Sequence, residues 1–99
     1  MALLHIAFQD GYEDDLVIVQ INGKEVFRKE GLRTNLLLGY ADSFEAQITE
    51  GSVKVKVILP SKKLSEIIAL KVSADVYLGL SIHDSKINYI ISHKPFGYL

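Results

Sequence analysis

Alternation of apolar and polar residues is the feature that most limits how this chain can fold. Its clearest instance is the segment 52–59, which reads SVKVKVIL. Because successive side chains of an extended strand point to opposite faces, one face carries only aliphatic residues and the other carries Lys54 and Lys56. The aliphatic residues are Val53, Val55, Val57 and Leu59. The segment predicts a strand with one buried face and one face in water.

Residues 76–92 carry the same alternation over twice the length, interrupted by Asp84-Ser85. A hairpin that turns at this dipeptide gathers the apolar residues on one face, and a slip of one residue would exchange the two faces. The predicted cross-strand pairs are Ile82 with Ile87, Leu80 with Tyr89, and Leu78 with Ile91. The segment therefore predicts a β-hairpin with a defined register.

A second hairpin is predicted at Asn22-Gly23, because this dipeptide tolerates the positive φ angles of a two-residue type I′ turn. In a regular ladder the pairs are Ile21 with Lys24, Val19 with Val26, and Val17 with Arg28, while Ile18 lies opposite Phe27. We expect this turn to join two antiparallel strands.

Other short apolar runs predict strands bounded by turn residues. The predicted strands cover residues 2–8, 16–21, 36–38, 44–49 and 64–72, and the intervening loops include 13–15 and 29–35. In 64–72 a helical spacing overlaps the strand pattern, and Ser61 would cap a short helix near residues 61–70. We favour the strand because Ile67 and Ile68 are β-branched and the run fits a period of two.

Seven to eight short strands, with turn signals every 8 to 12 residues, are typical of a β-sandwich. The chain is long enough for one domain and too short for two separate cores. We therefore predict a single all-β domain over residues 1–99, a two-layer antiparallel sandwich. The alternative is an α+β fold with one short helix near residues 61–70.

The chain as a whole matches no family that can be named from its residues. Over residues 17–59, a strand, an Asn-Gly-Lys turn, a threonine-containing connection, and Glu-Gly before the alternating valine strand follow one another. This succession resembles prealbumin-like sandwich modules. The resemblance implies a sandwich fold and transfers no function.

Composition disfavours several classes of partner. The formal net charge is −1, from 11 Lys and Arg against 12 Asp and Glu, whereas nucleic-acid binding relies on a basic excess. No stretch approaches the 18 or so apolar residues of a membrane span. We expect a soluble, cytoplasmic protein that binds neither nucleic acid nor membrane. The absence of cysteine excludes disulfides and thiolate chemistry.

No motif points to a catalytic, cofactor or metal site. The acidic residues Asp10, Glu13, Asp14 and Asp15 match no EF-hand spacing and are expected in a solvated loop. The histidines 5, 83 and 93 are expected at the surface or at strand edges, and the hairpin register places His83 and His93 too far apart to share one ion. We therefore assign no catalytic residue, no cofactor and no metal ligand.

Two features suggest an interaction surface. Lys54 and Lys56 share the wet face of one strand, and three large apolar residues, Phe96, Tyr98 and Leu99, lie at the chain end. The favoured hypothesis is a non-catalytic module that binds a protein partner or a second copy through a sheet edge, a loop end or the tail.

Two alternatives stay open. One is a sandwich that recognises a carbohydrate or a calcium-bridged ligand through its loops, with Tyr12 and Tyr40 as stacking faces beside Asp10 and Asp42. The other is a small enzyme whose site is assembled from scattered residues. Of these two alternatives, the enzyme is the less favoured.

The Asn-Gly hairpin is tested by Gly23→Val. A β-branched residue resists positive φ, so the free energy of unfolding should fall by more than about 1 kcal/mol. Denaturant unfolding measures the change, and an unchanged midpoint would contradict the hairpin.

Overall fold

Eight strands and one short 3-10 turn make up the computed structural model, which describes residues 1–96. In chain order they are β1 (Ala2–Phe8), β2 (Glu13–Ile21), β3 (Lys24–Arg33), β4 (Asp42–Ile48), β5 (Gly51–Leu59), η1 (Pro60–Lys62), β6 (Leu64–Val72), β7 (Val76–His83) and β8 (Lys86–Ser92). Residues 64–72 form a strand, as favoured, and the helix near residues 61–70 is reduced to η1.

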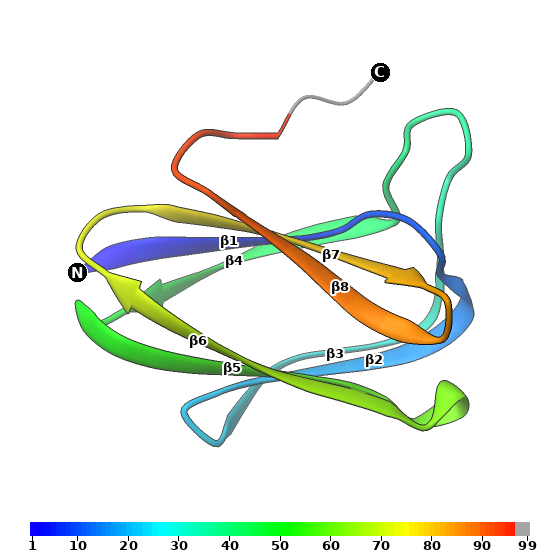
Figure 1. Cartoon of the computed structure of the whole chain (residues 1–99), viewed down its shortest axis with the longest axis horizontal. Helices are drawn as coiled ribbons and strands as arrows, with labels where there is room; N and C mark the ends of the chain where they lie inside the picture. Colours follow the sequence, from blue (N-terminus) through cyan, green and yellow to red (C-terminus); the bar gives the residue numbers. More distant parts are fainter. Residues whose placement is uncertain (97–99) are drawn as a thin grey trace.

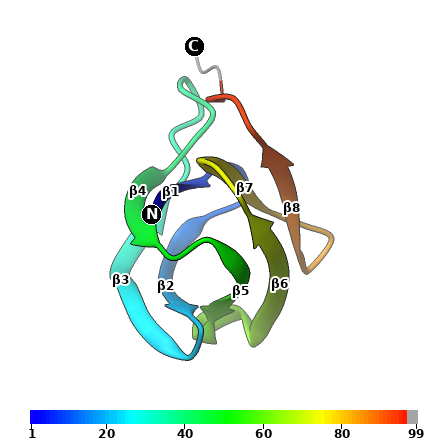
Figure 2. The ribbon, with the colours of Figure 1, turned by 90° about the vertical axis from the view of Figure 1, so that its left-hand side faces the viewer.

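The strands form two four-stranded sheets that pack face to face (Figure 1). Sheet A has the order β4-β1-β7-β8, and sheet B has the order β3-β2-β5-β6. Seen from the end, β3 lies beside β4 on one flank, and β6 lies beside β8 on the other (Figure 2). The predicted two-layer β-sandwich is confirmed.

Period-two alternation places one side of each central strand in the core between the sheets. In β5 the four aliphatic residues at odd positions are buried, as predicted, while Lys54 on the opposite face is exposed. Phe8 lies at the centre of an aromatic cluster with Tyr12, Phe27 and Phe44. The rings of Phe27 and Phe44 stack 4.5 Å apart and close the core at the flank where β3 meets β4.

One strand pair departs from the predicted antiparallel arrangement. Five of the six pairs in the described chain are antiparallel, but β1 runs parallel to β7, with Leu4 opposite Val76. Parallel neighbours need a long connection, and here the strands that pair, β1 and β7, are far apart in the sequence. The first strand thus occupies the interior of sheet A, between β4 and β7.

The hairpin of β7 and β8 has the predicted register at all three pairs. Asp84 and Ser85 have φ of 54° and 58°, the positive values of a type I′ turn. Tyr89 and Ile91, which were expected to be buried in the apolar face, are instead half exposed. They lie on an edge strand with one neighbour, so the packing on that side is incomplete.

The Asn22-Gly23 turn is present, but the predicted register fails two residues beyond it. Ile21 pairs with Lys24 and Gln20 with Glu25, as in the predicted ladder. The next pairs are shifted by one residue: Val19 pairs with Phe27, Ile18 with Arg28 and Val17 with Lys29. Val26 is the extra residue of a β-bulge, which shifts the rest of the ladder by one position. The bulge turns the larger Phe27 into the core and leaves Val26 partly exposed.

Three loop and strand assignments are also wrong. Residues 36–38 form a turn, not a strand, and residues 29–33 continue β3, where a loop was expected. Glu13, Asp14 and Asp15 begin β2, where a solvated loop was expected, and Asp15 is buried. Charged residues hid the strand ends at 13–15 and 29–33, whereas the run of three leucines at 36–38 imitated a strand.

The chain crosses from sheet A to sheet B through residues 9–12, in a junction fixed by buried hydrogen bonds. The Leu80 carbonyl accepts from the Gln9 N–H at 2.8 Å and from the Tyr12 hydroxyl at 2.9 Å. The Thr34 hydroxyl accepts from the Tyr12 N–H at 3.1 Å and donates to the Gln9 carbonyl at 2.8 Å. The junction therefore ties β1, β2, β3 and β7 together.

Gly11 is required at this junction. Its φ is +89°, and a Cβ built there would lie 2.1 Å from the Ile82 carbonyl oxygen.

Gly11→Ala should lower the free energy of unfolding by several kcal/mol, because the backbones must separate and the residue is strained. Gly39→Ala is the matched control, since Gly39 has φ +78° with open space around it. Equal losses in chemical denaturation would contradict this account of Gly11.

Candidate functional site

Three consecutive leucines project from the loop that joins β3 to β4. Leu36 is 90% exposed and Leu37 is 85% exposed, and Leu38 is partly exposed. Figure 1 shows this loop standing away from the sheets, at the right-hand end of the molecule. We call residues 35–40 the leucine loop.

The leucine loop is held in shape by hydrogen bonds to the side chain and main chain of Asn35, not by its apolar side chains. The Asn35 side-chain carbonyl accepts from the N–H groups of Leu37 and Leu38, at 2.9 and 3.2 Å. The Asn35 main-chain carbonyl accepts from the Gly39 N–H at 2.8 Å, and the Asn35 N–H donates to the Tyr40 carbonyl at 3.1 Å. The loop is therefore preorganised while its leucines stay in solvent.

A second apolar surface lies along β8, at the edge of sheet A. Tyr89 and Ile91 are half exposed on the face toward sheet B, and Ile90 is 59% exposed on the opposite face. Within residues 1–96 no strand pairs with the outer edge of β8. Sequence reasoning identified the hairpin correctly but did not find this exposed edge.

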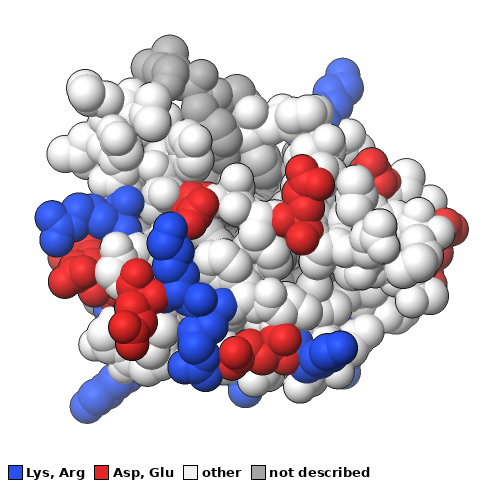
Figure 3. All heavy atoms as spheres, turned by 180° about the vertical axis from the view of Figure 1, so that it is seen from behind, with Lys and Arg blue, Asp and Glu red and all other residues white. Residues whose placement is uncertain are grey.

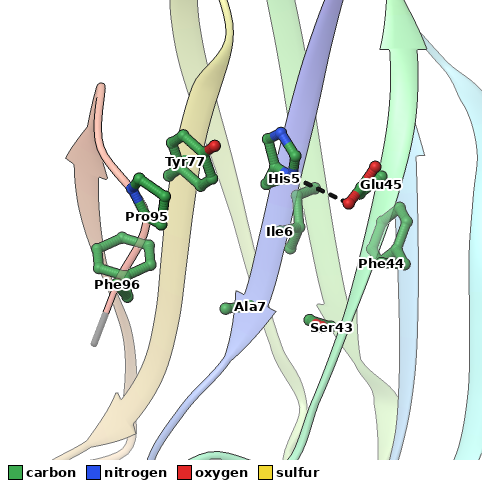
Figure 4. Close-up of a pocket in the computed structure, with 9 residues that line it drawn as sticks. All are labelled: His5, Ile6, Ala7, Ser43, Phe44, Glu45, Tyr77, Pro95 and Phe96. Carbon is green, nitrogen blue, oxygen red and sulfur yellow. Dashed lines mark ion pairs between the residues drawn. The ribbon is translucent and has the colours of Figure 1, made fainter. Parts of the chain in front are cut away.

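A shallow groove of about 170 Å³ runs over the outer face of sheet A, beside the tail residues Pro95 and Phe96 (Figure 4). In it, the His5 and Tyr77 rings stack 4.2 Å apart. Glu45 from β4 lies 3.3 Å from His5 Nδ1. Drug-sized ligands need cavities of about 300 Å³ or more, so the groove fits only a small group.

His5 is poorly placed to act as a general base in this groove. Its Nδ1 faces the Glu45 carboxylate, and its Nε2 is enclosed, with no hydrogen-bond partner among the described residues. A base must reach the proton that it removes, so a histidine with one nitrogen engaged and the other buried is not accessible to a substrate. His83 and His93 are exposed and lie elsewhere.

The predicted interaction residues do not form one surface. Phe96 lines the groove on the outer face of sheet A, whereas Lys54 and Lys56 lie on β5 in sheet B. Lys54 is exposed and pairs across the ladder with Ala69, and Lys56 is half-buried and pairs with Ile67. Tyr98 and Leu99 lie outside the described residues.

Charge is concentrated on the flank of β3 and β4. These two strands contain eight charged residues among 17, whereas β6 and β8 contain three among 16. Figure 3 shows basic and acidic groups interspersed on the face opposite to that of Figure 1, with no large field of one sign. An ion pair between Lys29 and Asp42, 2.6 Å apart, bridges the two strands.

Asp15 is the buried acid that sequence reasoning missed. Its carboxylate accepts hydrogen bonds from the Glu13 N–H, the Lys62 ammonium and the Ser61 hydroxyl, at 2.8, 2.8 and 2.9 Å. Burial by itself would raise the pKa of Asp15, but these hydrogen bonds and the Lys62 charge together hold the pKa below its usual value. Extending the period-two pattern back from Val17 would have placed Asp15 on the core face.

One of the two tyrosines expected to stack on a carbohydrate, Tyr12, is not available for that role. Tyr12 is buried with its hydroxyl bound to Leu80, so it offers no stacking face. Across residues 1–96, no three His, Asp or Glu side chains gather as metal ligands. The same part of the chain contains no helix that could span a membrane.

The Asp15 cluster predicts a pH dependence of stability. Since the folded-state pKa lies below the unfolded one, the stabilisation is present at neutral pH and is lost as the pH falls through the folded-state pKa. Asp15→Asn should lower the free energy of unfolding by about 1–3 kcal/mol at pH 7 and flatten its decline between about pH 5 and pH 2. Asp14→Asn, on an exposed neighbour, is the control. Parallel pH profiles of stability for Asp15→Asn and the unmodified chain would contradict the assignment.

Function must be argued from these surfaces alone. Comparison of the chain with protein-family models, curated protein sequences and solved structures finds no match. The two exposed apolar surfaces, on the leucine loop and on β8, are the features on which a function can be built.

Proposed function

We propose that this domain is a non-catalytic protein-interaction module that engages a partner protein through the leucine loop. The observation that carries the proposal is the exposure of Leu36 and Leu37 on a loop that hydrogen bonds of Asn35 hold in shape. Exposed apolar clusters that the fold does not need are typical of binding sites.

The energetics favour such a role. Burying a leucine side chain that was in water contributes about 1.5–3 kcal/mol, so Leu36 and Leu37 together offer a substantial driving force. Asn35 and Gly39 already hold the loop in one conformation, which lowers the entropy lost on binding. A preorganised aliphatic tip fits an apolar groove on the surface of a partner.

The composition of the loop supports a protein partner over a lipid surface. Residues 34–41, TNLLLGYA, contain no charged residue, whereas loops that bind membrane surfaces combine apolar tips with lysine or arginine. A cytoplasmic location and the absence of nucleic-acid binding remain predictions. So does a contribution to binding from Phe96, Tyr98, Leu99, Lys54 and Lys56.

The double variant Leu36→Ser/Leu37→Ser tests the proposal. Its free energy of unfolding should stay within about 0.5 kcal/mol of the unmodified chain, because neither leucine packs on the core. In an affinity capture from a lysate, a stoichiometric protein held by the unmodified domain should be lost. Quantitative mass spectrometry of the captured proteins is the measurement.

Ile67→Ser is the matched control, because Ile67 is an exposed aliphatic residue on β6, away from the loop. The same protein should be captured by the control and by the unmodified domain. Capture of an identical set by all three proteins, or of no stoichiometric protein by any of them, would overturn the proposal.

A further inference from the structure

The four sheet edges of the molecule differ in how well they are protected against pairing with another chain. An unprotected edge presents a row of free N–H and C=O groups, which charges, bulges or inward-pointing charged residues normally block. On one flank, β3 carries six charged residues and irregular register, and the Lys29–Asp42 ion pair ties it to β4. On the other flank, β6 turns Glu66 inward, half-buried opposite Val57.

The β8 edge has none of these protections. Its sequence, KINYIIS, contains one charged residue, Lys86 at its first position, and no proline. Its ladder with β7 runs without a register shift from Lys86 to Ser92. Tyr89 and Ile91 leave the face toward sheet B apolar and half exposed, and Ile90 adds an exposed apolar side chain to the opposite face.

The turn geometry identifies which backbone groups of β8 are free. In a two-residue hairpin, the residues that flank the turn, His83 and Lys86, form a hydrogen-bonded pair. Every second residue of β8, beginning with Lys86, then forms its backbone hydrogen bonds with β7. The residues between them, Ile87, Tyr89 and Ile91, direct their N–H and C=O groups to the open edge. These are the residues whose side chains face sheet B.

We propose that two copies of this chain form a twofold dimer by antiparallel pairing of β8 with β8, centred on Tyr89. Tyr89 is the middle residue of β8, so this register pairs the whole strand with itself. Tyr89 then faces Tyr89 of the second copy, and Ile87 faces Ile91. Each of these facing pairs can exchange two backbone hydrogen bonds, because the open-edge groups of β8 belong to these three residues.

The register is also chemically self-complementary. Lys86 lies opposite Ser92, so no two like charges face each other, and like charges directly opposite would destabilise the pair. The tyrosine pair and the two isoleucine pairs join on one face. The two copies of sheet A become one continuous eight-stranded sheet. The leucine loop joins β3 to β4 on the flank opposite to β8. The dimer is therefore independent of the proposed role of the loop.

The dimer is tested on the full chain by light scattering and native mass spectrometry over a range of concentrations. The unmodified chain should be dimeric at high concentration. Tyr89→Lys should raise the dimer dissociation constant at least about tenfold, because it places two ammonium groups face to face at the twofold axis. Val26→Lys, at a partly exposed aliphatic residue on the opposite flank, should leave the constant unchanged.

A charge exchange tests the register itself. Tyr89→Glu should weaken the dimer in the same way, and an equimolar mixture of Tyr89→Lys and Tyr89→Glu should form a mixed dimer, since position 89 faces itself only in the proposed register. Circular dichroism confirms that each variant is folded. A monomeric unmodified chain, a dimer that survives Tyr89→Lys, or two folded monomeric variants that fail to pair when mixed would each overturn the proposal.

Discussion

The crossing from sheet A to sheet B at residues 9–12 is the constraint on which the rest of the sandwich depends. Tyr12 enters the core there, directs its hydroxyl to Leu80 and places its ring edge-on to Phe8. Its backbone is bound to Thr34, which lies just beyond β3. Tyr12 thus links the packing of the two sheets to the end of β3. Gly11 allows the chain to approach β7 closely at this point. Burial raises the pKa of the Tyr12 hydroxyl well above its usual value, so the hydroxyl keeps the proton of this hydrogen bond at alkaline pH values where an exposed tyrosine would ionise.

Local patterns predicted the parts of the fold that depend on local chemistry. Alternation located β5, and the Asp84-Ser85 turn fixed the register of β7 and β8. The errors arose where a distant contact decides the outcome. The bulge at Val26 exists because Phe27 is needed against Phe8 and Phe44, and no pattern near Asn22 contains that information. The parallel pairing of β1 with β7 could not be predicted for the same reason, since both strands read as ordinary half-buried strands.

The candidate surfaces were harder to predict than the fold. Residues 36–38 are three leucines, which in isolation indicate a strand, and only the bridge between Asn35 and Tyr40 shows that they form the tip of a loop. Exposure at Tyr89 and Ile91 depends on which strand lies at the edge of a sheet, and that is a property of topology. Asp15 was misplaced because charged residues usually mark solvent, and its neutralising partner, Lys62, is 47 residues away.

The parallel pairing in sheet A has a consequence for the order in which the domain is made. β1 is synthesised first, and β4 can cover one of its edges, but its other edge must wait for β7, 72 residues later. At about 5–20 residues per second, that wait lasts roughly 4 to 14 s. During this time an apolar strand, ALLHIAF, keeps an open row of backbone groups. The nascent chain is therefore most exposed to mispairing before its last hairpin appears, and contacts of such long range are those that slow folding.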